Sequence, residues 1–271
     1  RHHPARPPQG ALFEASGGKG NTPLLCLLPG TTLMSVYAVK EVFGAFQGEG
    51  AQAGSPCVFV RFAGCNVWDG KEESREEAAR ERGGCARFCD TDFIDTDGHN
   101  GGRYKGVNAL VGVAEHEWNG FPRALQEARA SVPQYVLRRP SKLVVFTGGE
   151  PTLQLTPELV DSFHNAGWRT AIETNGSNQV PSNVGWVTVS PKPPKRVVLA
   201  TANEVKCLYP DVVPDPRVYE YLAPKRYVQP VDKATATELE SLEAFHKCVR
   251  FALDTPGWKV SLQLHKLMGV T

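Results

Sequence analysis

From residue 34 onward, short runs of β-branched residues alternate with stretches of helical periodicity, and this alternation constrains the fold more than any other feature. Strands are predicted at residues 57–64, 142–147, 169–174, 185–190, 204–209, 226–230 and 259–263, and helices at residues 108–118, 156–167 and 235–255. Alternation at this spacing is typical of βαβ units. We therefore predict an α/β domain with a mainly parallel sheet.

The first 33 residues differ from the rest of the chain, because they are rich in proline and glycine and have no sustained period. We expect residues 1–33 to be a disordered N-terminal extension or an upstream translation artefact, with Met34 as the natural start. Residues 34–271 are then expected to form one domain.

The residues that follow four of the predicted strands are unusual. They read "TGGEP", "ETNG", "SPKPP" and "QPVD", at residues 147–151, 173–176, 190–194 and 229–232. Parallel sheets and barrels place their binding sites at the carboxyl ends of the strands. We expect these segments to share one rim, together with a cysteine-containing segment after residues 57–64.

Composition argues against two classes of partner. The formal net charge is +1, from 30 Lys and Arg against 29 Asp and Glu, whereas a nucleic-acid-binding protein usually has a clear basic excess. No apolar run approaches the roughly 18 residues of a membrane helix.

The chain has seven cysteines, an odd number, and we expect no signal peptide. These features predict reduced thiols, used for metal binding or catalysis, and a cytoplasmic location.

Three of the cysteines, Cys65, Cys85 and Cys89, share one polar, glycine-rich segment. The other four stand singly among apolar neighbours and are interpreted as small buried side chains: Cys26, Cys57, Cys207 and Cys248.

A structural zinc site would need a fourth ligand beside the three thiolates, and His99 is a candidate. A [4Fe-4S] cluster held by three thiolates instead keeps one iron open for a small molecule. We favour the cluster, because the acidic "DTDFIDTDGHNGG" after Cys89 does not resemble a compact zinc knuckle.

Cysteines after a strand, followed by "GGEP" and "ETNG" at later strand ends, resemble the radical S-adenosylmethionine (SAM) superfamily. A longer series, "YAVKEVFGAFQGEG", "VFVRFAGCN", "CDTDF", "TGGEPTLQL", "AIETNG", "VSPK", "NEVK", "QPVD" and "LQLHK", is similar to the 7-carboxy-7-deazaguanine synthase family in the same order. The resemblance covers residues 34–271. It implies a catalytic domain with a modified, incomplete radical-SAM (β/α)6-type barrel.

Two features depart from the usual superfamily spacing CxxxCxxC. Nineteen residues separate Cys65 from Cys85, and we expect a short surface helix within them. The last gap, "ARF", has three residues in place of two, and we expect the backbone to absorb the extra residue. Phe88 is the candidate contact to the adenine of SAM.

The resemblance implies a lyase that converts 6-carboxy-5,6,7,8-tetrahydropterin into 7-carboxy-7-deazaguanine with loss of ammonia, in the biosynthesis of queuosine and other 7-deazapurines. The implied cofactors are a [4Fe-4S] cluster, SAM and Mg²⁺, and one electron from the cluster would yield a 5′-deoxyadenosyl radical. An external donor such as flavodoxin and a homodimer are also implied.

The family's contacts can be assigned to matching positions of this chain. Contacts to SAM are expected from Phe88, Asp90, Gly149, Ser190, Pro191, Lys192, Gln229, Pro230, Val231 and Asp232. Contacts to the substrate are expected from Phe46, Gln47, Gly48, Glu49, Arg61, Thr147, His265 and Thr271. Thr91 is the expected protein ligand of Mg²⁺.

Structural interpretations stay open beside these assignments. "QGEG" (47–50) would also suit a hairpin turn, the Gly148-Gly149 pair a tight turn, and Arg61 a structural acidic partner. Glu150 is expected to stabilise its loop. Two other functions also stay open, an activating enzyme of the radical SAM superfamily and a zinc-stabilised binding module. "QGEG" and Arg61 suit a small carboxylated ring better than a protein surface.

Overall fold

The computed structural model describes residues 35–81, 84–120, 141–232, 237–264 and 266. The described residues all belong to one compact unit, Met34–Thr271. None of the helices among the described residues combines the length and the apolar character needed to cross a bilayer.

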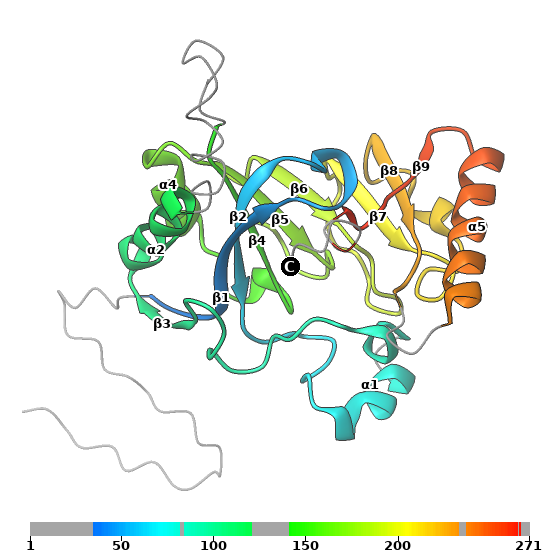
Figure 1. Cartoon of the computed structure of the whole chain (residues 1–271), viewed down its shortest axis with the longest axis horizontal. Helices are drawn as coiled ribbons and strands as arrows, with labels where there is room; N and C mark the ends of the chain where they lie inside the picture. Colours follow the sequence, from blue (N-terminus) through cyan, green and yellow to red (C-terminus); the bar gives the residue numbers. More distant parts are fainter. Residues whose placement is uncertain (1–34, 82–83, 121–140, 233–236, 265, 267–271) are drawn as a thin grey trace, which may run out of the picture. The chain divides into compact units, whose positions relative to one another are not determined.

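One nine-stranded sheet organises this unit (Figure 1), in the order β3-β1-β2-β4-β5-β6-β7-β8-β9. The strands are β1 (Val36–Phe46), β2 (Pro56–Phe62), β3 (Gly102–Lys105), β4 (Leu143–Gly148), β5 (Arg169–Thr174), β6 (Trp186–Val189), β7 (Glu204–Leu208), β8 (Lys225–Gln229) and β9 (Trp258–Val260). From β2 through β4 to β9 every pairing is parallel, and β1 pairs antiparallel with both β2 and β3. The predicted α/β fold with a mainly parallel sheet is confirmed, and the sheet is open, with β3 and β9 at its edges.

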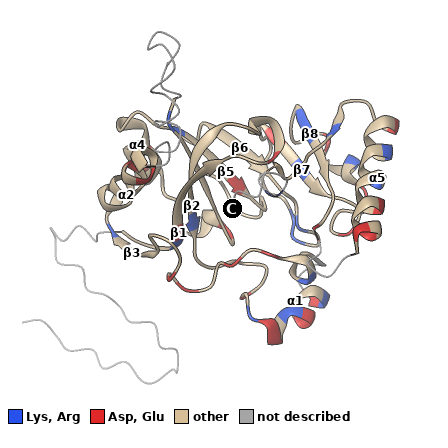
Figure 2. Cartoon of the chain, viewed as in Figure 1, with Lys and Arg blue, Asp and Glu red and all other residues tan. Residues whose placement is uncertain are grey.

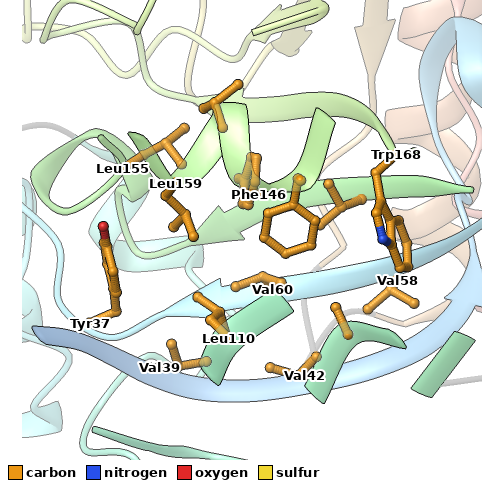
Figure 3. Close-up of a cluster of buried hydrophobic side chains, with 14 of the residues drawn as sticks. Tyr37, Val39, Val42, Val58, Val60, Leu110, Phe146, Leu155, Leu159 and Trp168 are labelled. Atoms are coloured by element: carbon orange, nitrogen blue, oxygen red, sulfur yellow. The ribbon is translucent and has the colours of Figure 1, made fainter. Parts of the chain in front are cut away.

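Four helices accompany the sheet in the described part of the chain: α1 (Arg75–Glu81), α2 (Val107–Gly120), α4 (Pro157–Asn165) and α5 (Glu238–Asp254). Helices α2 and α4 cover one face of the sheet around β1, β2 and β4, and α5 packs on β8 and β9. Leu110, Leu159 and Phe146 fill the first of these cores (Figure 3) and are completely buried.

Successive side chains of a strand point to opposite faces of the sheet. Here one face carries core residues and the other carries residues that line cavities. On β2, β4 and β5 the helix-covered face carries Val60, Phe146 and Ile172, which belong to the core. Their neighbours on the opposite face are Arg61, Thr147 and Glu173, which line cavities. The alternation of apolar and polar residues therefore separates the core from the site.

Helix ends follow from local hydrogen bonding. Thr156 accepts a hydrogen bond from the backbone N–H of Leu159 (3.3 Å) and Pro157 occupies the first turn, which begins α4. Gly167, with φ of +79°, lies just beyond its end. The helices predicted at 108–118, 156–167 and 235–255 agree with α2, α4 and α5 apart from one to three residues at each end.

Two strands, β1 and β3, were not predicted. The register of β1 against β2 shifts between Val39 and Glu41, a bulge that interrupts the alternation of apolar and polar residues. Strand β3 has only four residues, two of them charged. Such strands lack a clear period of two, because their pairing is set by the neighbouring strand and not by their own pattern.

Candidate active site

The segments that follow the parallel strands meet around one cavity, which we call the cysteine cavity. It draws side chains from the carboxyl ends of β4 to β8 and from the segment after β2. The predicted site residues that line it are Glu49, Cys65, Cys85, Phe88, Cys89, Asp90, Thr91, Gly149, Ser190, Lys192 and Gln229. The structure thus brings together residues that are up to 180 positions apart in the sequence.

A second cavity, which we call the Arg61 cavity, lies against the inner face of β1 and β2. The predicted residues Phe46, Glu49, Arg61, Asp90, Thr91 and Thr147 line it. Both cavities are lined by Glu49, Asp90, Thr91, Glu173 and Gln263. Ligands in the two cavities would therefore lie side by side.

Several predicted residues line neither cavity. Gln47 donates a hydrogen bond to Glu173 (2.9 Å), and the carbonyl of Gly48 accepts one from the backbone of Leu264 (3.0 Å). Pro191 and Val231 are buried, Pro230 is half-buried, and Asp232 is exposed. His265 and Thr271, like Cys26, lie outside the described residues.

The three cysteines are free and half-buried. Cys65 follows β2, whereas Cys85 lies in a 3₁₀ helix, η3 (Gly84–Phe88), that ends just before Cys89. A Cβ atom on Gly149 would lie 2.3 Å from the carbonyl oxygen of Gly64 and 2.7 Å from the Cβ of Cys65. Glycine is therefore required there, because the backbone passes directly against the first cysteine.

Electrostatics link the three thiols to one another. Burial raises the pKa of Cys85 to about 11, while Lys192 lowers it and the neighbouring Cys89 and Cys65 raise it. Burial also raises the pKa of Cys89. A bound cationic metal centre would reverse these shifts, because thiolates that ligate a metal lose their protons.

The donor set fits a cluster better than a single ion. No three His, Cys, Asp or Glu side chains in the described part of the chain lie close enough to hold one metal ion. His99, the candidate fourth zinc ligand, lines the Arg61 cavity and its Nε2 lies 3.2 Å from Glu117. Three free thiols that line one cavity suit a larger centre that joins them through several iron atoms.

The cysteine cavity is also lined by a charged group, the Lys206 cluster, formed by Lys206, Glu49 and Glu173. The Lys206 ammonium bonds Glu49 and lies 2.8 Å from Glu173, and its side chain is only 4% exposed. The amides of Gln229 and Gln263 each donate to Glu49 at 2.9 Å. Burial alone would raise the pKa of Glu49, but Lys206 and the two amides lower it to about 2. Glu49 is therefore a carboxylate throughout the physiological range.

Gln229 offers a group that no described residue satisfies. Its Nε2 donates a hydrogen bond to Glu49, but its Oε1 is buried without a hydrogen-bond partner in the described part of the chain. A buried acceptor without a partner is costly. Because Gln229 lines the cysteine cavity, a donor group of a bound ligand would satisfy this oxygen.

Arg61 is half-buried and has a structural acidic partner, one of the two interpretations left open by the sequence, since its Nε lies 2.7 Å from Glu41. The terminal nitrogens of the guanidinium have no partner among the described residues, and the side chain lines the Arg61 cavity. These nitrogens can bind an anionic ligand.

The loop after Cys89 is fixed by Lys40. The Lys40 ammonium contacts Asp92 (2.7 Å), Asp97 (2.6 Å) and the carbonyl of Ile94 (3.0 Å). These contacts hold Thr91 at the boundary of the two cavities.

Glu150 has the loop-stabilising contacts expected from the sequence. It is fully buried and accepts hydrogen bonds from the side chain of Thr174 (2.7 Å) and the backbone N–H groups of Thr152 (3.1 Å) and Asn175 (2.8 Å). It thereby joins the loops that follow β4 and β5.

Sequence reasoning missed Lys40, Glu173, Lys206 and Gln263. A signal existed for two of them, because Glu173 in "AIET" and Lys206 in "EVKCL" interrupt apolar strands that a parallel sheet buries on both faces. For Lys40 and Gln263 no such signal exists, since their partners come from remote segments.

No family model matches the chain. It is 42% identical over 235 residues to the 7-carboxy-7-deazaguanine synthase of Burkholderia multivorans, 39% to that of Bordetella pertussis and 38% to that of Bradyrhizobium diazoefficiens. Each match covers 86% of this chain and 99% of the relative. The chain belongs to the 7-carboxy-7-deazaguanine synthase family.

The fold agrees with this assignment. The crystal structure of QueE from Escherichia coli superposes with a TM-score of 0.53 and 25% sequence identity, over 85% of this chain and 95% of that chain. The predicted family and enzyme class, a lyase of the radical SAM superfamily, are confirmed. A [4Fe-4S] cluster and SAM are the cofactors that the family implies.

Proposed function

We propose that this enzyme is a 7-carboxy-7-deazaguanine synthase that converts 6-carboxy-5,6,7,8-tetrahydropterin into 7-carboxy-7-deazaguanine with loss of ammonia. One observation carries the proposal beyond family membership. A cavity with three free thiols adjoins a cavity lined by Arg61, whose terminal nitrogens have no partner among the described residues, and the two cavities share Glu49, Glu173 and Thr91. This arrangement suits a reaction in which a radical formed in one cavity acts on a carboxylated ring in the other.

Cys65, Cys85 and Cys89 would hold the [4Fe-4S] cluster. When bound, the cluster and SAM supply the 5′-deoxyadenosyl radical that removes a hydrogen atom from the substrate. The residues of this chain bind and orient the cofactor: the Oε1 of Gln229 is a free acceptor for a donor group of SAM. Lys192, which donates to Ser190 at 2.6 Å, places a cation beside the thiols.

The substrate would be recognised by groups of opposite charge. Glu49 and Glu173 are carboxylates that accept hydrogen bonds from the N–H groups of the pterin ring, and the low pKa of Glu49 keeps it an acceptor. The free terminal nitrogens of Arg61 would bind the substrate carboxylate. Phe46 and Phe59 supply apolar walls of the same cavity.

Magnesium is proposed at Thr91. Mg²⁺ commonly takes one or two protein oxygens and completes its octahedron with water and substrate oxygens. Thr91 lies where the two cavities meet, and Lys40 fixes the loop that carries it. The ion would then neutralise the substrate carboxylate jointly with Arg61.

A homodimer is proposed through α5, which has an outward-facing apolar stripe opposite its buried face. Leu239, Leu242 and Leu253 are 65%, 49% and 78% exposed. The helix begins with acidic residues and carries basic ones farther along (Figure 2), so two antiparallel copies would oppose unlike charges. Leu253→Glu should produce a monomer in light scattering, whereas an unchanged mass would exclude this surface.

The remaining expectations are also proposals. A one-electron donor such as flavodoxin is proposed as the reductant, and a cytoplasmic location follows from the need to keep the thiols reduced. Residues 34–271 are proposed as the catalytic domain, so a variant that starts at Met34 should keep full activity.

The test is anaerobic incubation of the reconstituted enzyme with the carboxypterin, SAM, dithionite and Mg²⁺. Formation of 7-carboxy-7-deazaguanine supports the proposal, and Arg61→Gln should raise KM for the substrate. Formation of 5′-deoxyadenosine alone would indicate another radical SAM enzyme. Colourless protein with one bound zinc would indicate a binding module and overturn the proposal.

A further inference from the structure

The nineteen-residue segment between Cys65 and Cys85 does more than cover the surface. Arg75, the first residue of α1, donates from one terminal nitrogen to the carbonyl of Ala86 (2.8 Å) and to the carbonyl of Cys89 (3.0 Å). Both carbonyls belong to the turn that joins the second and third cysteines. The insert therefore contacts the part of the cysteine loop where the spacing has one extra residue.

These two carbonyls need a donor. Ala86 lies within the 3₁₀ helix η3 and Cys89 just past its end, where carbonyls have few partners within the helix. Among the described residues, the carbonyl of Ala86 accepts only from the backbone N–H of Cys89 and from Arg75. The turn itself is weakly closed, because the backbone N–H of Cys89 lies 3.4 Å from the oxygen of Ala86. A cation at this end satisfies the carbonyls and interacts favourably with the helix dipole.

Arg75 is itself held rigidly. Its guanidinium lies 4.3 Å above the ring of Trp68, and its Nε donates to Glu72 at 2.8 Å. Trp68 is 4% exposed, donates to Ser74 at 3.0 Å and meets the ring of Phe93 edge-on at 5.9 Å.

The same small core touches the ligand loop. Trp68 and Phe93 form a buried cluster against which Cys65 and Cys89 pack. One structural unit thus reaches the first cysteine through packing and the last cysteine through a hydrogen bond. Figure 1 shows α1 beside the turn that it caps.

We propose that Arg75 is a positioning residue for the iron–sulfur cluster, and that the long insert compensates for the extra residue between Cys85 and Cys89. The insert supplies the cap that holds the lengthened turn in the shape that directs both thiolates to one cluster. This inference rests on the proposed function, because it requires that the three cysteines bind a cluster.

The test compares the reconstituted wild-type enzyme with Arg75→Gln, Arg75→Lys and the control Arg80→Gln, which changes an exposed arginine of the same helix. Two properties are measured: the rate at which a chelator removes iron, and the electron paramagnetic resonance spectrum of the reduced cluster with and without SAM. Thermal unfolding of the iron-free proteins shows whether the fold is intact.

Arg75→Gln should lose iron about ten-fold faster or more, which is the change expected when a charged donor to a buried carbonyl is lost. Its spectrum should be altered and respond weakly to SAM. Arg75→Lys should recover part of the loss, since an ammonium can still donate to both carbonyls, and Arg80→Gln should match the wild type.

Wild-type rates and spectra in Arg75→Gln would overturn the inference while leaving the proposed function intact. A wild-type enzyme that binds no iron would overturn both. If iron-free Arg75→Gln fails to fold, Trp68→Phe decides, because it keeps an aromatic ring at this position but weakens the stacking on Arg75. Iron loss from a folded Trp68→Phe at the wild-type rate would contradict the inference.

Discussion

Two groups of residues that line the cysteine cavity are built in opposite ways. We call the Lys206 cluster with Gln229 and Gln263 the Lys206 wall, and Cys65, Cys85 and Cys89 the cysteine wall. On the Lys206 wall, the buried charges satisfy one another within the protein. Lys206 lies between two carboxylates, and the amides of Gln229 and Gln263 both donate to the other oxygen of Glu49, Oε1. On the cysteine wall, three thiols face the cavity as free groups, and burial raises the pKa of two of them, Cys85 and Cys89. Folding completes the first wall, whereas the second is completed by a cofactor.

This difference has a physical reason. A carboxylate buried during folding must have its partner at once, because an unpaired buried charge costs several kcal/mol. A thiol can be buried neutral at little cost and ionise later, when a metal arrives. The Lys206 wall should therefore determine the stability of the protein, and the cysteine wall its content of iron.

The largest expected effect is at the cysteine wall. Cys85→Ala should leave the enzyme without a stable cluster and without turnover, because a cube held by two thiolates lacks the third protein ligand. Iron per chain and product formation measure this directly. Cys248→Ala is the matched control, since Cys248 is also a buried free thiol but belongs to the core under α5. Loss of iron in the control would mean that the assignment of ligands is wrong.

The second prediction concerns the Lys206 wall. Lys206→Met leaves Glu49 and Glu173 buried without their cation, which should lower the free energy of unfolding by about 3–5 kcal/mol. Urea denaturation of the iron-free protein measures the change. Combining it with Glu49→Gln should recover part of the loss. Arg217→Met, which removes an exposed ion pair with Asp215, should have no measurable effect.

An equal loss of stability in Lys206→Met and Arg217→Met would contradict the contrast between the two walls. A stable Lys206→Met protein that no longer binds substrate would also be informative. It would mean that the two carboxylates share a proton in the absence of Lys206 and that their charge matters for binding alone.

The contrast also explains what the sequence could predict. The residues of the cysteine wall could be predicted from the sequence, because Cys65, Cys85 and Cys89 lie in one segment. The segments "TGGEP", "SPKPP" and "QPVD" could be placed beside them, because they follow strands that a parallel sheet aligns at one rim. Seven of the nine strands were predicted for the same reason, as apolar runs with a clear pattern.

The Lys206 wall was largely missed. Its members come from β5, β7, β8 and the segments after β1 and β9, and no local pattern links a lysine at 206 to glutamates at 49 and 173. Only Glu49 and Gln229 were assigned in advance, both through the family resemblance. Hydrogen bonds between residues more than 100 positions apart are consequences of topology, which the sequence fixes only through the packing of the whole sheet.

The third prediction is a pH dependence next to the Lys206 wall. Burial raises the pKa of Glu204 from 4.5 to about 7. Between these values the folded protein keeps a proton that the unfolded chain releases, so the free energy of unfolding falls as the pH rises, by at most about 1.4 kcal/mol per pH unit. Above the folded pKa the contribution is constant.

Glu204→Gln should remove this slope, because an amide does not titrate and still accepts the hydrogen bond that Ala51 donates to Glu204. Urea denaturation at several pH values between 4.5 and 8 compares the variant with the wild type. Glu243→Gln, at an exposed position of α5, is the control. Parallel curves for wild type and Glu204→Gln would contradict the raised pKa.

The smallest change in the free energy of unfolding is expected at Lys266, which contacts both Asp90 and Asp232. Asp90 also lines the cysteine cavity. All three side chains are more than a third exposed, so Lys266→Ala should change the free energy of unfolding by less than about 1 kcal/mol. The two ion pairs join Lys266 to the loops that carry Asp90 and Asp232. The KM of Lys266→Ala for SAM should therefore still rise, by up to about five-fold.

Salt distinguishes this effect from the others. The Lys266 contacts are screened by mobile ions, so the difference between Lys266→Ala and wild type should shrink as ionic strength rises, whereas the effect of Lys206→Met should persist. Lys259→Ala removes an exposed lysine from β9 and should leave KM unchanged. A Lys266 effect that survives high salt would mean that these exposed charges act as a buried network, and the two walls would then differ less than their burial indicates.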